Sequence, residues 1–274
     1  VRPVNSQFVW GRQVIPIATE GKGECELADL ENSHTCIQYQ YSYQRQGEIE
    51  SSETLLLNIF CSYWVINRTN ETLFLAGKNE TPVIRLPSAD ISVNFASIQP
   101  DPVTTPLQPF LFNTGSKKAV VRLRKGSSPW SPRVSLGKQN CTCVCIPAAA
   151  PFTLTDSLYS VSVKRLQEPF TATQLITISP QYVFVNKTSM DLWIQQQDQS
   201  FSLPASSCIC HTEFLPGSHR LLSIKRATSN SYSTEFDCDG SERMDVVLPG
   251  EPEDLLSVTT SQIGDLQAVT IDML

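Results

Sequence analysis

The chain has 274 residues, 41% of them hydrophobic and 18% charged, with a formal net charge of −6 and a pI near 5.2. This acidic balance disfavours nucleic acid as a partner, because phosphate binding requires clustered Lys and Arg. No apolar run approaches the ~20 residues of a membrane helix, and the first residues lack the basic and apolar regions of a signal peptide, so we expect neither feature.

Taken in chain order, the sequence predicts strands nearly everywhere. Short runs rich in Val, Ile, Thr, Tyr and Phe are separated by Pro, Gly, Asn and Ser, and no long stripe with a 3.6-residue period occurs. The 18 prolines suit turns and sheet edges and would break helices. We therefore predict an all-β chain. The predicted strands include residues 37–43, 55–60, 121–125, 159–163 and 175–178.

The predicted strand that contains Val121-Arg-Leu-Arg-Lys125 carries the densest basic stretch of the chain. Its apolar and basic residues alternate, and alternate residues of a strand point to opposite faces of a sheet. The pattern predicts one buried face and one solvated basic face.

Two sequence blocks recur along the chain. Residues 63–75 match residues 182–194 through a shared hydrophobic-Asn-basic-Thr core, and Asn67 and Asn186 are 119 residues apart. Downstream, Ile84-Arg-Leu-Pro87 resembles Phe201-Ser-Leu-Pro204. A fixed offset between such blocks indicates an internal structural repeat.

A second block centres on an aromatic residue. Trp10 and Trp130 are 120 residues apart, and Tyr232 takes the Trp place in a third, weaker copy. Each turn-like aromatic segment is a candidate anchor for a bound peptide, so we predict that Trp10, Trp130 and Tyr232 are partly exposed. We expect the other two tryptophans, Trp64 and Trp193, to lie in the core.

Each repeat of about 120 residues has the size of a self-standing β-sandwich, larger than a solenoid rung or a propeller blade. We predict tandem β-sandwich-like repeat modules excised from a longer array. Residues 1–36 are predicted to end a preceding repeat, residues 37–156 to form the module around Asn67, and residues 157–274 to form the module around Asn186. The last strand is expected to lead into a next repeat.

The repeated Asn-x-Thr segments are predicted to be structural turns. Asn tolerates the left-handed conformation, and its side chain satisfies nearby backbone groups. Asn67 with Thr69, and Asn186 with Thr188, are therefore expected to hold a turn on whose integrity binding depends, without touching a ligand themselves. These segments are also glycosylation sequons, and three further sequons begin at Asn70, Asn79 and Asn140.

The cysteines and histidines offer weak chemical signals. Nine cysteines occur, and Cys141, Cys143 and Cys145 alternate along one strand face, which favours reduced, buried thiols over disulfides. Cys-x-Cys also differs from the Cys-x-x-Cys knuckle of a zinc site, so we expect no metal and no cofactor. The only histidines are His34, His211 and His219, and no catalytic motif accompanies them, so we do not expect an enzyme.

These blocks resemble the adaptor-binding repeat region of the vacuolar protein sorting-associated thirteen family, the bridge-like lipid-transfer proteins. The resemblance rests on the residues 173–188, a strand ending in Pro-aromatic followed by the Asn turn, and on Ser128-Pro-Trp-Ser131. It covers most of the chain. The Asn67 copy departs from it, because Cys61-Ser62 stands where the other copy has Pro180-Gln181.

The resemblance implies a non-catalytic module that binds adaptor proteins through their short Pro-x-Pro motifs, and these adaptors place the parent protein at membrane contact sites. It implies a peripheral location on the cytoplasmic side of organelle membranes, without membrane insertion, and lipid handled elsewhere in the parent protein. The cysteine content and the divergent Asn67 block favour the Golgi-associated paralogue linked to Cohen syndrome. Pro100-Asp-Pro102 is itself a Pro-x-Pro within a proline-rich loop.

Two other hypotheses remain open on the sequence. The five sequons and nine cysteines would also fit a secreted or cell-surface β-sandwich glycoprotein that binds a protein ligand. A carbohydrate-active sandwich enzyme would need two carboxylates that converge in a cleft.

Overall fold

The computed structural model describes the residue ranges 21–28, 34–45, 53–78, 83–88, 93–94, 99–100, 110–112, 119–137, 141–149, 154–168, 170–217, 220–240, 243–250 and 254–274. Within 21–58, 93–94 and 99–100 it describes the backbone alone. All regular structure in these ranges is β-strand, as the sequence predicts. None of the described residues forms a helix long and apolar enough to cross a membrane.

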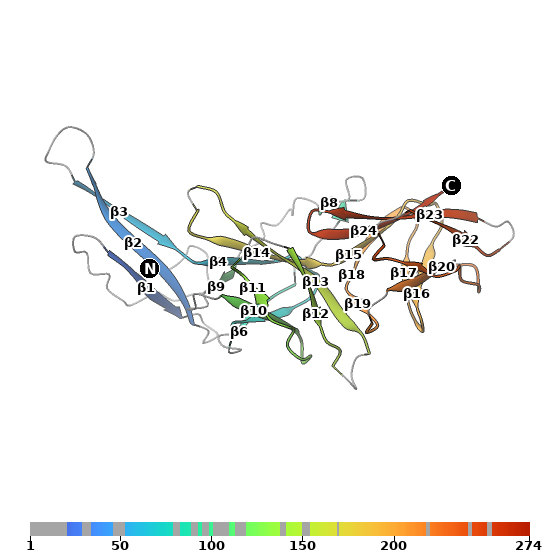
Figure 1. Ribbon diagram of the computed structural model, residues 1–274, viewed down its shortest axis with the longest axis horizontal. Coiled ribbons are helices and arrows are strands. Elements are labelled where there is room, and N and C mark those ends of the chain that lie inside the picture. Colours follow the sequence, from blue (N-terminus) through green and yellow to red (C-terminus); the bar gives the residue numbers. More distant parts are fainter. Residues whose placement is uncertain are drawn as a thin grey trace.

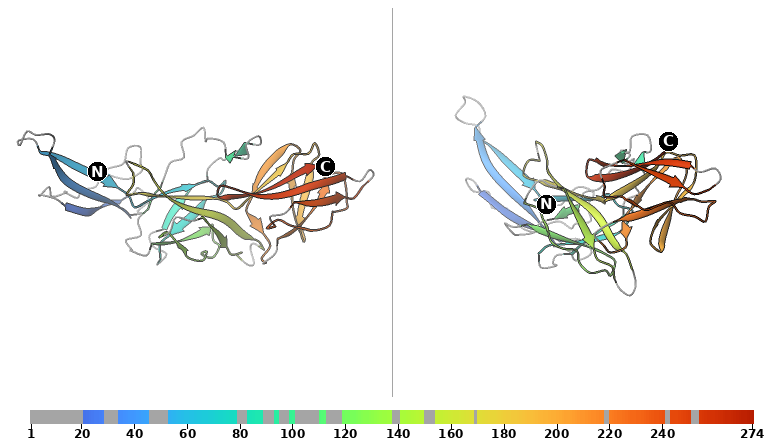
Figure 2. Two further views of the ribbon diagram at one scale, coloured as in Figure 1. Left: turned by 45° about the horizontal axis from the view of Figure 1, so that its top comes forward. Right: turned by 45° about the vertical axis from the view of Figure 1, so that its right-hand side comes forward.

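The molecule is elongated, with one three-stranded sheet at the N-terminal end and two β-sandwiches following along its long axis (Figure 1, Figure 2). The N-terminal sheet is antiparallel in the order β1-β2-β3. Its strands are β1 (Gly21–Ala28), β2 (His34–Arg45) and β3 (Glu53–Phe60).

The first sandwich has a large and a small sheet. The large sheet has the order β12-β13-β14-β4-β9, in which β14 and β4 are parallel and the other neighbours antiparallel. Its strands are β4 (Tyr63–Asn67), β9 (Phe110–Phe112), β12 (Cys141–Ile146), β13 (Asp156–Arg165) and β14 (Gln174–Pro180). The small sheet has the order β11-β10-β5-β6. Its strands are β5 (Leu73–Ala76), β6 (Val83–Leu86), β10 (Val120–Lys125) and β11 (Val134–Ser135).

The second sandwich repeats this arrangement strand for strand. Its large sheet has the order β22-β23-β24-β15-β18, again with one parallel pair, β24 and β15. These strands are β15 (Tyr182–Asn186), β18 (Ser207–His211), β22 (Met244–Leu248), β23 (Asp254–Ile263) and β24 (Leu266–Met273). The small sheet is β21-β20-β16-β17, with β16 (Leu192–Gln196), β17 (Gln199–Leu203), β20 (Leu221–Arg226) and β21 (Phe236–Asp237). The sequence repeat is therefore a structural repeat.

Alternating side chains fill the space between the two sheets of each sandwich. The first core contains Val65, Leu75, Leu123 and Ile176, all fully buried, and the second contains their counterparts from the later strands. In β10, Val121 and Leu123 face this core while Arg122 and Arg124, which alternate with them, face outward, which confirms the predicted basic strand face.

The two sandwiches are joined by a continuous strand. β14 lies in the first large sheet and β15 in the second, with only Gln181 between them, and the backbone of Gln181 bonds to Leu158 and Gln267. Leu158, at the start of β13, is 3% exposed and packs in the second core. The next residue, Tyr159, packs in the first core, so β13 contributes to both cores. The sequence-based boundary at residues 156–157 remains a prediction.

Two short elements lie outside the repeated pattern. β19 (Glu213–Phe214) belongs to the second half of the chain but pairs with the first residues of β13. β7 (Val93–Asn94) and β8 (Gln99–Pro100) form a two-stranded sheet, and β7 lies close to β18. Asp101 and Pro102, the rest of the Pro-x-Pro, lie outside the described residues.

Several expectations on single residues need correction. Trp64 and Trp193 are half-exposed on outer sheet faces, because their positions alternate with the core residues of β4 and β16. The thiols are buried at Cys61 and Cys238, but Cys141 and Cys143 are exposed, because they project from the outer face of the edge strand β12. Trp10 lies outside the described residues.

Candidate functional site

The Asn67 side chain fastens the two sheets of the first sandwich to each other. Asn67 ends β4 in the large sheet and is 4% exposed. Its Nδ2 donates to the carbonyls of Glu71 at 2.8 Å, Leu86 at 3.3 Å and Pro87 at 2.8 Å. Leu86 is the last residue of β6 in the small sheet, and Pro87 directly follows it. Its Oδ1 accepts from the backbone N and the Oγ1 of Thr69, at 3.0 and 2.7 Å.

Asn186 makes the same set of bonds in the second sandwich. It is fully buried at the end of β15, and its Nδ2 donates to the carbonyls of Met190 at 2.8 Å, Leu203 at 3.2 Å and Pro204 at 2.9 Å. Its Oδ1 accepts from the backbone N and the Oγ1 of Thr188, at 3.0 and 2.7 Å. We call each of these arrangements the Asn clasp.

The clasps explain why the Asn and Thr recur with a Leu-Pro downstream. Among the described non-glycine residues, a positive φ occurs at Gln197 and Ser206, so neither clasp Asn uses the left-handed conformation considered for it. The amide instead satisfies backbone carbonyls that lie inside the sandwich. Both hydrogens of Nδ2 are used inside the protein, so a sugar attached to Asn67 or Asn186 is incompatible with the clasp.

The predicted aromatic anchors pack against cations on the small sheets. The guanidinium carbon of Arg124 lies 4.7 Å from the ring centre of Trp130 and 5.3 Å from that of Phe74. Lys225 Nζ lies 4.9 Å from the ring centre of Tyr232. Trp130 and Tyr232 are both half-exposed and occupy equivalent places in the two sandwiches, as the third block of the repeat predicts.

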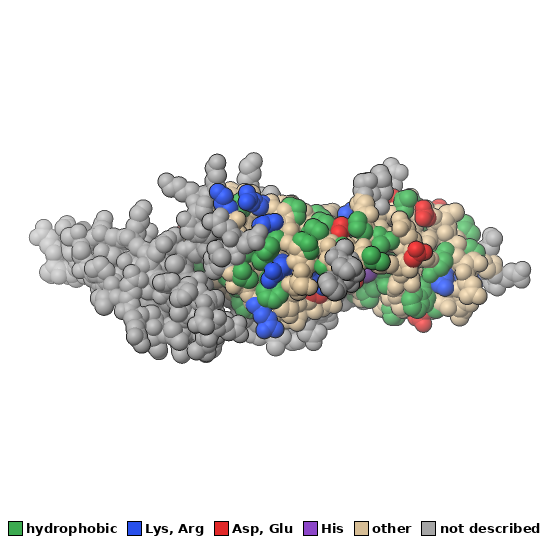
Figure 3. Space-filling model, turned by 90° about the horizontal axis from the view of Figure 1, so that it is seen from below, with side chains coloured by type: hydrophobic (Ala, Val, Ile, Leu, Met, Phe, Trp, Pro, Cys, Tyr) green, Lys and Arg blue, Asp and Glu red, His purple; other side chains and the backbone are tan. Residues whose placement is uncertain are grey.

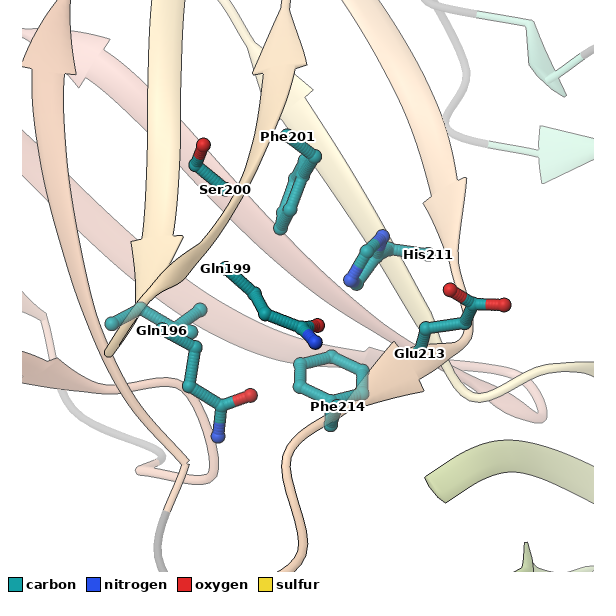
Figure 4. Close-up of a pocket in the computed structure, with 8 residues that line it drawn as sticks. Gln196, Gln199, Ser200, Phe201, His211, Glu213 and Phe214 are labelled. Atoms are coloured by element: carbon teal, nitrogen blue, oxygen red, sulfur yellow. The ribbon is translucent and has the colours of Figure 1, made fainter. Parts of the chain in front are cut away.

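A small hollow of about 170 Å³ opens between the edge strands β17 and β18 of the second sandwich (Figure 4). Its aromatic walls are Phe201 from β17, His211 from β18 and Phe214 from β19. The rings of Phe201 and His211 stack with their centres 3.9 Å apart, and the His211 and Phe214 rings meet edge to face at 5.0 Å. The other lining residues are Gln196, Gln199, Ser200, Glu213 and Leu222.

The aromatic residues that line the hollow carry no charge at physiological pH. Burial lowers the pKa of the His211 imidazole below its ordinary value, although the neighbouring Glu213 opposes this effect. The neutral ring is a good stacking partner for a planar or apolar group, and the glutamine side chains at the rim offer hydrogen bonds. Residues from five strands meet here, and none of them was predicted from the sequence to bind a ligand.

Sequence reasoning missed the polar contact between the two sandwiches. Glu71, from the turn after β4, accepts hydrogen bonds from Tyr159 Oη and, at 3.0 Å, from Thr212 Oγ1. Lys125 Nζ bridges Glu71 at 3.1 Å and Glu213 at 2.7 Å. Glu71, Lys125 and Tyr159 belong to the first sandwich, whereas Thr212 lies between β18 and β19 and Glu213 begins β19. We call this group the junction cluster.

The described residues hold no group of three or more His, Cys, Asp and Glu that could bind a metal ion. Cys210 and His211 are half-buried neighbours on β18, and His219 lies outside the described residues. The exposed Cys141 has a hydroxyl neighbour, Ser160 Oγ, at 2.9 Å.

Thiol reactivity should follow this distribution. Burial raises the pKa of Cys145 and of Cys210 to about 11, helped by Asp156 at the first and by Cys208 at the second. Since the thiolate is the reactive form, both should react with iodoacetamide about two orders of magnitude more slowly at mildly alkaline pH than a thiol of ordinary pKa. The exposed Cys141 should be modified first. Peptide mapping by mass spectrometry measures the order, and fast labelling of Cys210 in the folded chain would contradict it.

A comparison with protein families matches residues 24–239 to the model described as "Vacuolar-sorting associated protein 13, adaptor binding domain". The matched stretch includes both Asn clasps, the aromatic hollow and the junction cluster. The chain belongs to this family. A search of curated proteins finds no match.

Membership of the adaptor binding domain family gives the chain its general role, that of a protein-interaction module that binds adaptor proteins. The family match also favours a non-catalytic module. The resemblance drawn from the Asn and Trp blocks is thereby confirmed at the level of the family.

Proposed function

We propose that the chain recognises Pro-x-Pro motifs of adaptor proteins at the hollow between β17 and β18. The observation that carries this proposal is an aromatic-walled hollow beside a sheet edge. β17 is the last strand of its sheet among the described residues, so its outer backbone groups can pair with an added strand. Prolines favour extended peptides and pack their rings on aromatic walls, which Phe201, His211 and Phe214 supply.

The Asn clasp gives this site its rigidity. Asn186 donates to the carbonyls of Leu203, the last residue of β17, and of Pro204. Both lie close in sequence to the hollow-lining residues 199–201. A rigid edge lowers the entropy cost of adding a peptide strand. The clasp residues thus support binding indirectly, and Trp130 and Tyr232, which lie on outer sheet faces, belong to a different surface.

In the parent protein, this recognition would bring a lipid-transfer bridge to membrane contact sites. We propose that the chain works on the cytoplasmic side of organelle membranes as a peripheral component, with lipid carried elsewhere in the parent protein. The assignment to the Golgi and to the paralogue linked to Cohen syndrome stays a prediction from the sequence.

The test is binding of biotinylated Pro-x-Pro peptides, with proline-to-alanine versions as controls, measured by biolayer interferometry. The Phe201→Ala chain should bind at least ~10-fold more weakly, equal to about 1.4 kcal/mol, because one aromatic wall is removed. Ile84→Ala changes the equivalent residue of the first sandwich and should leave affinity unchanged. Equal retention of the proline and alanine peptides would refute the proposed motif, and equal loss in both variants would refute the location.

A further inference from the structure

A stripe of cations and aromatic rings crosses the outer face of the first small sheet. Arg85 on β6, Phe74 on β5 and Arg124 on β10 are direct cross-strand neighbours, so their side chains lie on one face. Trp130 continues the row beyond Arg124. We call these four residues the Arg-aromatic stripe. Arg122, whose Nε donates to the Ser131 carbonyl at 2.9 Å, flanks it on the same strand.

The surroundings of the stripe are strongly basic for so acidic a chain. The described residues 61–78, 83–88 and 119–137 contain seven Lys and Arg against one acidic residue, Glu71, and Glu71 is occupied in the junction cluster. Figure 3 shows Lys and Arg side chains gathered over the first sandwich and Asp and Glu side chains over the second. The first sandwich thus presents a positive face on a chain of net charge −6.

The two stripe arginines are open to a carboxylate in different ways. Arg85 is exposed, and Arg124 is fixed between the rings of Phe74 and Trp130. Neither arginine forms an ion pair with a described residue. The Nε of Arg124 is buried. A guanidinium whose faces stack on rings keeps its terminal N–H groups for a bidentate acceptor, and it loses little side-chain entropy on binding.

We propose that the Arg-aromatic stripe binds an acidic, extended segment of a partner protein. This site is separate from the hollow between β17 and β18, which lies on the second sandwich. Arg85 and Arg124 are two strands apart, which is about 10 Å. In an extended segment of polyproline II geometry, carboxylates three residues apart lie on the same side at a similar distance of about 9 Å. The flanking rings exclude water from the contact and strengthen each charged hydrogen bond.

The second sandwich provides an internal comparison. Its equivalent row is Ser202, Trp193, Lys225 and Tyr232, with the same cross-strand pairing. A serine replaces Arg85 and a lysine replaces Arg124, so the row has one cation and no guanidinium. Of these two equivalent rows of described residues, the one in the first sandwich therefore has the two arginines that can bind carboxylates.

The test uses the full chain and a fluorescein-labelled peptide of Glu-Ser-Ser repeats, with a Gln-Ser-Ser peptide as the neutral control. Fluorescence anisotropy at low ionic strength should show at least ~10-fold tighter binding of the Glu peptide. Arg85→Gln and Arg124→Gln should each weaken it at least ~5-fold, because each removes one charged contact. Lys225→Gln in the second sandwich and Arg243→Gln, an exposed arginine elsewhere, should change it less than ~2-fold.

Circular dichroism spectra establish that each variant is folded, and Arg85→Gln changes an exposed side chain that no core contact needs. Equal binding of the Glu and Gln peptides, or an equal effect of Arg85→Gln and Lys225→Gln, would overturn the proposal. A parallel sedimentation assay uses vesicles that contain phosphatidylserine. Vesicle binding that requires Arg85 and Arg124, without peptide binding, would also overturn it and assign the stripe to a membrane surface.

Discussion

The Asn186→Asp variant is expected to lose at least ~4 kcal/mol of stability in the second sandwich. The substitution keeps the size of the side chain but replaces three donated hydrogen bonds with an oxygen that faces the carbonyls of Met190, Leu203 and Pro204. The carbonyls of Met190 and Pro204 keep hydroxyl donors from Thr188 and Ser207, so the main cost is that of a buried carboxylate facing three carbonyl oxygens. A buried charge left without a partner costs about 3–5 kcal/mol. Asn67→Asp should have the same effect on the first sandwich.

Urea unfolding followed by tryptophan fluorescence measures this loss. Asn230→Asp and Asn70→Asp make the same chemical change at exposed positions and should shift stability by less than ~0.5 kcal/mol. Thr188→Ser keeps the hydroxyl that bonds Asn186 and should cost less than Thr188→Val, which removes it. If the Asn186→Asp chain unfolded at the same urea concentration as the unaltered protein, the clasp bonds would contribute little to stability.

The clasp also shows how far sequence reasoning reached. The repeat offset predicted that Asn67 and Asn186 are equivalent and structural, and the alternation in β10 predicted its buried and basic faces. Both features are local patterns, set by strand geometry and by residues close in sequence. The equivalence of Trp130 and Tyr232 followed from the same kind of pattern.

The hollow and the junction cluster were beyond such reasoning. Phe201, His211 and Phe214 come together only because two edge strands of different sheets lie side by side, and no sequence period records that arrangement. Glu71 stands in the Asn-Glu-Thr sequon that begins at Asn70, and nothing in this segment of the sequence points to a buried contact. Its partner Thr212 is 141 residues away in sequence, and this separation is set by tertiary packing alone.

The burial of the tryptophans was predicted wrongly for a related reason. Trp64 and Trp193 were assigned to the core by residue type, but each sits one position out of phase with the core residues of its strand. Strand phase decides which face a side chain takes, and it outweighs hydrophobicity here. Trp193 therefore lies on the outer face of the second small sheet, opposite Ser202.

The Glu71→Ala variant is expected to destabilise the contact between the sandwiches by about 2–3 kcal/mol. The change removes the acceptor of Tyr159 Oη and Thr212 Oγ1 and one of the two carboxylates that pair with Lys125. The contact is partly buried, since the Glu71 side chain is 19% exposed. Breaking a fully buried ion pair costs about 3–5 kcal/mol, and the partial exposure lowers that figure. Glu71→Gln keeps an acceptor oxygen and should cost about half as much.

The pH range of this contribution follows from Lys125. Burial alone would lower the pKa of its ammonium, but the hydrogen bonds and charges of Glu213 and Glu71 raise that pKa above its ordinary value of 10.5. A raised pKa in the folded chain means that the stabilisation is complete at neutral pH and is lost as the pH rises through the raised value. Burial and the charge of Glu71 likewise raise the pKa of Tyr159, so its hydroxyl stays protonated over the same range.

The decisive measurement is a double-mutant cycle between the two sandwiches. Glu71→Gln and Thr212→Val change opposite sides of the junction cluster, and their combined cost should be smaller than the sum by about 0.5–1.5 kcal/mol. Glu168→Ala removes an exposed carboxylate and should leave the unfolding curve unchanged. Additive costs would show that the sandwiches are held by their shared strand and the β13–β19 pairing alone. Coupled costs would show that the cluster fixes the position of β19, and with it the Phe214 wall of the aromatic hollow.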